Sequence, residues 1–263
     1  MPDVLLDGLP VLDFLEITLN THKVAHLTGR DQSSVSRIHR KMSELLGIDF
    51  GKQRDGIYRA GANQALLNGL RQSSQWLRLN QQSSELRWVG HPGNRPLHRG
   101  EPPVLPAAVE LHSAQHQRIA ALLEQRVLDL AVVETEDRTL AGGPLTALPL
   151  VRYPLLLIQA PESPGPQAHP RVCVSPLQLQ AAQKVHPLEP LPWPSGRTGI
   201  DVILVRTELL FSPAIGQLIQ AIRASYRRHF EAVPDLDWTE LDPLNSPQPP
   251  SCSPPPSAAC ASR

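Results

Sequence analysis

Residues 22–41 constrain the fold of this 263-residue chain more than any other stretch. Their apolar spacing predicts two short helices joined by a tight turn. Ala25 is small where two helices must cross closely, and Gly29 supplies the positive φ that such a turn needs. Val35 and Ile38 recur at helical spacing, so they predict the face by which the second helix packs against the first. A helix-turn-helix is therefore expected here.

The outward face of the second helix is polar, with Asp31 as its expected N-cap. Glutamine bonds adenine, serine bonds base edges or phosphates, and arginine forks onto guanine or phosphate. A solvated amphipathic helix without a DNA partner would carry the same residue types, so the pattern alone leaves both interpretations open. The residues expected to contact DNA are Gln32, Ser33, Ser34, Ser36, Arg37, Arg40 and Lys41.

Basic charge gathers around this segment, although the whole chain balances 25 Lys and Arg against 25 Asp and Glu. Residues 20–60 hold 8 basic and 4 acidic side chains, whereas residues 1–19 hold 4 acids and no base. A local surplus of positive charge is what phosphate neutralisation requires. The zero net charge argues against a nonspecific nucleic-acid coat.

The flanking sequence carries a family resemblance. An earlier helix is expected around 14–17, the second helix ends in Leu46-Gly47, and Phe50, Arg54 and the run 58–61 follow. Over about the first 85 residues this succession resembles the winged helix-turn-helix domain of LysR-type transcriptional regulators. The resemblance implies an all-α winged domain that binds double-stranded DNA, with Arg54 of the wing bonding phosphate.

The sequence also departs from the family pattern. Asp31 stands where the family usually has serine, and Thr28 and Arg30 replace apolar residues. Tyr58-Arg59 replaces the usual Leu-Thr, and Phe50 and Arg54 are spaced more widely than the family pattern spaces them. A carboxylate beside phosphates is repelled by them, so Asp31 predicts weaker DNA affinity than is usual for the family.

Residues 61–85 predict one long helix with a single apolar stripe, formed by Leu66, Leu70, Leu77 and Trp76. The resemblance implies that it is a linker helix paired antiparallel with its twin in a homodimer. The alternative is a helix that lies back on its own domain. We expect the dimer, because a helix-turn-helix used as a pair gains affinity and half-site spacing.

From residue 86 onward, strand-like and helix-like segments alternate, which predicts an α/β sheet. The nearly continuous apolar run 127–134 is typical of a buried parallel strand. Ser212 and Pro213 predict a helix N-cap and first helical residue. The other segments expected here are strands at 86–89, 108–112, 145–150 and 153–158, a helix from about 114 to 125, and a closing strand and helix over 203–228.

This half resembles the LysR effector domain, less specifically, at 123–131, 148–150, 155–158 and 203–228. The resemblance implies a periplasmic-binding-protein-like domain. It is shortened, because the proline-rich run before 106 leaves no room for the family's first helix and the second lobe at 160–203 is abbreviated. No effector-contact residue carries over, so small-molecule binding is left open.

The expected fold class is α/β overall, with an N-terminal all-α winged helix-turn-helix before the shortened α/β domain. The tail is expected to be disordered, because its Pro/Ser-rich composition buries too little apolar surface. The expected segments are a DNA-binding domain at 1–60, a linker and dimerisation helix at 61–85, an effector-like domain at 86–230 and the tail at 231–263.

Catalytic and metal chemistry find no support in the residues. No nucleophile elbow or phosphate-binding glycine loop occurs. His112 and His116 lack a clear third ligand, and Asp129 in its apolar strand predicts a structural acid rather than a functional one. We therefore expect no enzyme, cofactor or metal site.

The residues also bear on the compartment. No membrane span or export signal is found, and three cysteines without metal spacing fit a reducing cytoplasm.

The sequence thus predicts a cytoplasmic, dimeric, sequence-specific DNA-binding transcriptional regulator. The alternative is a ligand-binding or partner-binding module whose helix-turn-helix has lost DNA binding. Asp31, the zero net charge and the shortened effector domain motivate that alternative.

Overall fold

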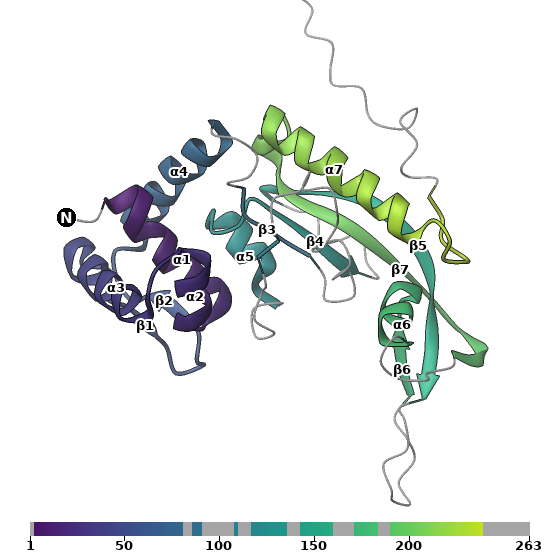
Figure 1. The fold of residues 1–263 in the computed structure, drawn as a ribbon. Coiled ribbons are helices and arrows are strands. Elements are labelled where there is room, and N and C mark those ends of the chain that lie inside the picture. Colours follow the sequence, from purple (N-terminus) through teal and green to yellow (C-terminus); the bar gives the residue numbers. More distant parts are fainter. Residues whose placement is uncertain are drawn as a thin grey trace, which may run out of the picture.

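The computed structural model shows a mixed α/β fold, as the sequence predicts. Helices at the N-terminus lie beside a five-stranded sheet, and the long helix α7 (Pro213–Phe230) runs along that sheet (Figure 1). The residues that the structure describes are 3–80, 86–90, 108–109, 117–135, 143–159, 171–183 and 190–238.

The N-terminal module, defined here as residues 3–60, is a winged helix-turn-helix. Val24, Val35 and Ile38 are buried in its core, so the predicted packing face of the second helix is confirmed. The elements are η1 (Val4–Gly8, a π-helical turn), α1 (Leu9–Thr18), α2 (Thr21–Leu27), α3 (Gln32–Leu46), β1 (Phe50–Lys52) and β2 (Tyr58–Ala60). The two strands pair antiparallel and form the wing.

Local chemistry sets the ends of the helix-turn-helix. Gly29 has φ +62°, which confirms the predicted turn, and Gly47 at φ +59° ends α3. Asp31 is the N-cap of α3, since its carboxylate accepts a hydrogen bond from the Ser34 backbone N–H at 2.7 Å. The predicted cap is therefore confirmed.

Helix α4 (Gln64–Asn80) follows the wing, within the predicted span 61–85, and residues 81–85 lie outside the described part. Its buried face includes Arg71, Ser74, Gln75 and Arg78, whereas the predicted apolar stripe lies mostly in solvent. Leu67 and Leu79 are buried as well, so α4 packs inward with a mixed polar and apolar face, whereas an ordinary amphipathic helix buries its apolar face alone.

The sheet has the strand order β3-β4-β7-β5-β6, and only β3 and β4 pair in parallel. The sequence predicts that β4 is a buried parallel strand. This is wrong for the edge of β4 that pairs with β7, because β7 runs antiparallel to it. The strands are β3 (Trp88–Val89), β4 (Leu130–Thr135), β5 (Leu145–Gln159), β6 (Arg171–Val174) and β7 (Pro190–Arg206).

Two predicted strands, at 145–150 and 153–158, form the single strand β5. Its register against β7 shifts at Pro149 and at Pro154, where proline cannot donate a ladder hydrogen bond. The chain bends at these points rather than ending the strand. β7 likewise begins at Pro190, well before the expected closing strand.

The two faces of the sheet bury different partners. One face packs on α7, which begins at Pro213 after the N-cap Ser212, as expected. The other packs on α5 (Ile119–Glu124) and also on Ile17 of α1. The remaining elements are α6 (Pro176–Gln183) and η6 (Thr207–Leu209). Because Ile17 joins a sheet core, the N-terminal module and the sheet share buried surface.

Several predictions fall on residues outside the described part. They concern His112 and His116, most of the strand at 108–112, the start of the helix at 114–125, and the tail from 239 onward. Residues 231–238, expected in a disordered tail, are folded. Val233 is buried in the core between the sheet and α7, and Asp237 forms an isolated antiparallel β-bridge with Arg152 of β5. The segment is therefore packed against the sheet domain. No helix of the described part is long and apolar enough to cross a membrane.

Candidate nucleic-acid interface

The structure places the predicted contact residues on one exposed helix face. Val35, Ile38 and Met42 point into the core of the N-terminal module, which turns the opposite side of α3 to solvent. Ser34 is half-buried, and the exposed members of the predicted set are Gln32, Ser33, Ser36, Arg37, Arg40 and Lys41.

The start of α3 holds a chain of side-chain hydrogen bonds. Ser33 and Ser34 donate their hydroxyls to the two carboxylate oxygens of Asp31, at 2.6 and 2.7 Å. Arg37 Nη2 donates to Ser34 Oγ at 2.9 Å, and Gln32 Nε2 donates to Thr21 Oγ1 at 2.8 Å. Both serine hydroxyl protons are thus already used, so these serines can donate to a base only if the Asp31 contacts open.

Asp31 stays ionised at neutral pH. The hydrogen bonds from Ser33 and Ser34 hold the pKa of its carboxyl well below the usual range for aspartate. A fixed negative charge therefore sits at the tip of α3, where DNA would approach. The positive charge of Arg37 lies one turn away, and Arg40 and Lys41 make no ion pair with any residue that the structure describes.

Arg54 lies at the tip of the wing, in the turn between β1 and β2, and is exposed. The wing is fixed to α3 by His39, whose Nε2 lies 2.8 Å from the Phe50 carbonyl oxygen. The His39 ring also meets Phe50 and Tyr58 edge-on, at centroid distances of 5.7 and 5.9 Å. Sequence reasoning missed His39, since a histidine between Ile38 and Arg40 carries no local signal of a structural role.

Solved structures of LysR-type transcriptional regulators match this chain over most of its length. A full-length OxyR variant from Pseudomonas aeruginosa has 12% identity and a TM-score of 0.45, over 86% of this chain and 95% of its own. Full-length LysG from Corynebacterium glutamicum with bound effector Arg has 14% identity and a TM-score of 0.43, over 87% and 99%. The chain is similar to LysR-type regulators.

A third match, Vibrio fischeri DarR in complex with DNA, has 13% identity and a TM-score of 0.39, over 82% of this chain and 97% of its own. No protein-family model matches the sequence, and no curated protein does.

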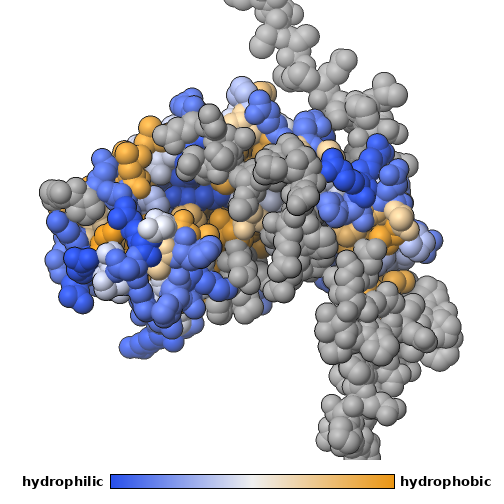
Figure 2. Space-filling view, in the orientation of Figure 1, coloured by the Kyte–Doolittle hydropathy of each residue, from blue (hydrophilic) through white to orange (hydrophobic). Residues whose placement is uncertain are grey.

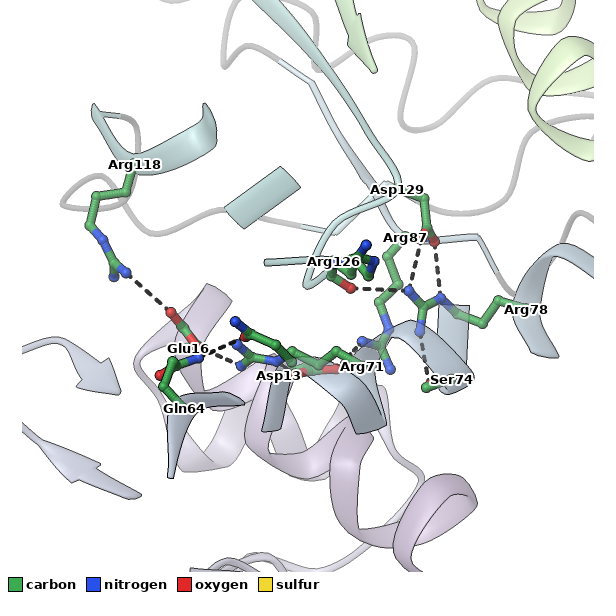
Figure 3. Close-up of polar contacts among 11 residues, drawn as sticks. Asp13, Glu16, Gln64, Arg71, Ser74, Arg78, Arg87, Arg118, Arg126 and Asp129 are labelled. Carbon is green, nitrogen blue, oxygen red and sulfur yellow. Dashed lines mark hydrogen bonds and ion pairs between the residues drawn. The ribbon is translucent and has the colours of Figure 1, made fainter. Parts of the chain in front are cut away.

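Behind the interface, charged side chains are buried between α1, α4 and the sheet (Figure 3). Arg71 donates from Nε to Asp13 at 2.8 Å and from Nη2 to Glu16 at 2.7 Å. Arg87, just before β3, also binds Asp13, and Arg118 binds Glu16 at 3.2 Å. We call these five residues the buried junction. Two of the four acids of residues 1–19, which look unbalanced in the sequence, are therefore paired with distant arginines.

Asp129 anchors the other end of α4. It accepts hydrogen bonds from Arg78 Nε at 3.0 Å, Arg78 Nη2 at 2.8 Å, Gln75 Nε2 at 2.8 Å and the Arg87 backbone N–H at 2.9 Å. These contacts give Asp129 a structural position at the start of β4. Within the described ranges, no group of three or more His, Cys, Asp or Glu is arranged to hold a metal ion.

Proposed function

We propose that this protein is a transcriptional regulator that binds double-stranded DNA through α3 and the wing. The observation that carries the proposal is the exposed face of α3, which holds Arg37, Arg40 and Lys41. The wing packed against this helix exposes a further base, Arg54, at its tip. This arrangement suits a helix in the major groove with a basic wing on the neighbouring phosphates.

The test is Arg37→Ala, titrated on the DNA upstream of the protein's own gene at fixed salt. We expect binding to weaken by about 1–3 kcal/mol, the range for one good base or phosphate contact. The matched control is Arg228→Ala, an equally exposed arginine on α7. Unchanged affinity for Arg37→Ala would remove that residue from the interface.

An opposite effect is expected from Asp31→Ser in the same titration. Serine still caps a helix, but the change removes the negative charge and frees the Ser33 and Ser34 hydroxyls. Affinity should rise, and more at low salt than at high salt. If no variant and no salt concentration gives binding over nonspecific competitor, the alternative of a module that has lost DNA binding is favoured.

We also propose that two copies associate through α4. Leu66, Trp76 and Leu77 on this helix are 46, 53 and 39% exposed, although large hydrophobic side chains are usually buried. Figure 2 shows hydrophobic residues reaching the surface among the N-terminal helices. A second α4 laid antiparallel on this stripe would cover it, and would pair the two DNA-binding helices.

Trp76→Glu should disrupt this association. A central tryptophan typically contributes about 2 kcal/mol or more to an interface, so the dimer dissociation constant should rise by at least about 30-fold. Sedimentation velocity across a concentration series measures it. Leu45→Glu is the matched control, because Leu45 is 50% exposed but lies on α3. A wild-type chain that sediments as a monomer at all concentrations would overturn the proposal.

For organisation, we propose the segments expected from the sequence, namely 1–60 for DNA binding, 61–85 for the linker and 86–230 for the effector-like domain. The packing of Ile17 into the sheet core supports close coupling between the first and the third. A protein that acts on chromosomal DNA in this way would work in the cytoplasm.

A further inference from the structure

A pocket of about 410 Å³ opens where the N-terminal module meets α4 and β3. Its size falls in the range of small-molecule sites, which run from about 300 to 1,000 Å³. It lies at the junction of the module and the sheet, so a bound molecule would touch both. We propose that this pocket binds a small carboxylic acid with an apolar body.

The apolar part of the proposal rests on the walls. Leu6, Leu27 and Leu77 border the pocket, and they are 63, 41 and 39% exposed. Phe14 adds an aromatic face. Orange and blue residues meet in this part of the surface in Figure 2. Large exposed leucines around one cavity favour a ligand that covers them, because their burial releases apolar surface from water.

The anionic part rests on Arg87, which lines the pocket although only 5% of it is exposed. Its Nη1 binds Asp13, a carboxylate that it shares with Arg71. The Phe14 ring lies 4.9 Å from the guanidinium carbon and covers one face of the group. Its Nε and Nη2 make no hydrogen bond with the described residues, and the residue lines the pocket. The in-plane edge is therefore available, and a carboxylate accepts from such an edge in fork geometry.

The surrounding charge also favours an anion. Burial and the positive charge of Arg78 lower the pKa of Arg87. The nearby carboxylates Asp13 and Asp129 therefore offset only part of the cost of keeping this guanidinium charged. Arg30 lies at the mouth of the pocket, where it pairs with Asp7. Asp13 is the carboxylate that binds Arg87, and it is shared with Arg71, so a ligand carboxylate on Arg87 would add the counter-charge that Asp13 supplies only in part.

The test uses the full chain and three probes in isothermal titration calorimetry. 3-Phenylpropanoate carries both features, 3-phenylpropanamide lacks the charge, and acetate lacks the apolar body. We expect 3-phenylpropanoate to bind at least tenfold more tightly than either of the other two. Equal binding of the amide, or no binding of 3-phenylpropanoate at millimolar concentration, would overturn the proposal.

Variants locate the site without touching the buried junction. Leu27→Glu and Leu6→Glu each place a negative charge at the mouth, on exposed positions that tolerate substitution, and each should weaken 3-phenylpropanoate at least tenfold. Leu45→Glu, away from the pocket, should leave binding unchanged. Wild-type affinity in both mouth variants would overturn the assignment.

Leu77 also belongs to the proposed dimer face, so the titration is run at protein concentrations below and above self-association. Equal affinity at both supports a pocket that stays open in the dimer. Loss of binding above self-association would mean that a second copy covers the pocket, and would overturn the proposal. None of these measurements depends on DNA binding.

Discussion

Replacing Arg71 by alanine should destabilise the folded protein by about 3–5 kcal/mol, the usual cost of removing one partner of a buried charge pair. Arg71 is 1% exposed and holds Asp13 and Glu16, which are 0 and 2% exposed. In the buried junction without Arg71, Asp13 would keep its ion pair with Arg87, and Glu16 would keep its ion pair with the half-buried Arg118. A buried carboxylate with fewer partners pays a large desolvation penalty.

Urea unfolding at neutral pH measures this cost, and the melting temperature should fall by about 10 °C for a chain of this size. Arg228→Ala, on the exposed side of α7, should change stability by less than about 0.5 kcal/mol. The triple variant Asp13→Asn, Glu16→Gln, Arg71→Met should recover part of the loss, since neither buried carboxylate is left charged, although Arg87 then loses its partner Asp13 and Arg118 loses Glu16. If the single and triple variants are equally unstable, lost packing rather than unpaired charge causes the effect.

Local signals explain why the helix-turn-helix was predictable. Gly29 with its positive φ, the Asp31 cap and the burial of Val35 and Ile38 all depend on residues close together in the sequence. Short-range sterics and hydrogen bonding decide such features, so a single sequence carries them. The exposed polar face of α3 follows from the same periodicity.

The buried junction could not be predicted in this way. Arg71 lies 58 residues from Asp13, Arg87 lies 74 residues from it, and Arg118 lies 102 residues from Glu16. No periodic pattern links such positions, because tertiary packing alone brings them together. The pairing of β7 between β4 and β5 is non-local in the same sense, and it made the sheet mostly antiparallel.

Helix α4 shows how a correct pattern leads to an incomplete picture. The spacing of Leu66, Leu70 and Leu77 predicts an apolar stripe. In a globular protein such a stripe normally packs against the core of its own chain. The inner face instead combines Leu67 and Leu79 with polar residues, because Arg71 and Arg78 bind buried carboxylates on α1 and before β4. An arginine that will be buried cannot be told from a solvated one by its type alone.

Replacing Asp129 by alanine should also destabilise the protein by about 3–5 kcal/mol. The residue is 0% exposed and accepts from Arg78, Gln75 and the Arg87 backbone N–H, so its loss leaves buried donors of three residues without this acceptor. Urea unfolding again measures the effect. Asp129→Asn, which keeps the shape and one carbonyl acceptor, should cost less than alanine. Equal stability of Asp129→Ala and wild type would contradict a structural role for this carboxylate.

The pH dependence gives Asp129 a second readout. Burial acts to raise the pKa of its carboxyl, but the charge and hydrogen bonds of Arg78, with those from Arg87 and Gln75, outweigh burial and lower the pKa below the usual aspartate value. Its contribution is therefore fully present above the unfolded-state pKa of about 3.9, and is lost as pH falls through the lower folded-state pKa. The stability difference between wild type and Asp129→Asn should stay constant from pH 7 to about pH 5 and shrink below about pH 4. A difference that grows on acidification would mean that the carboxyl is protonated in the folded protein at neutral pH.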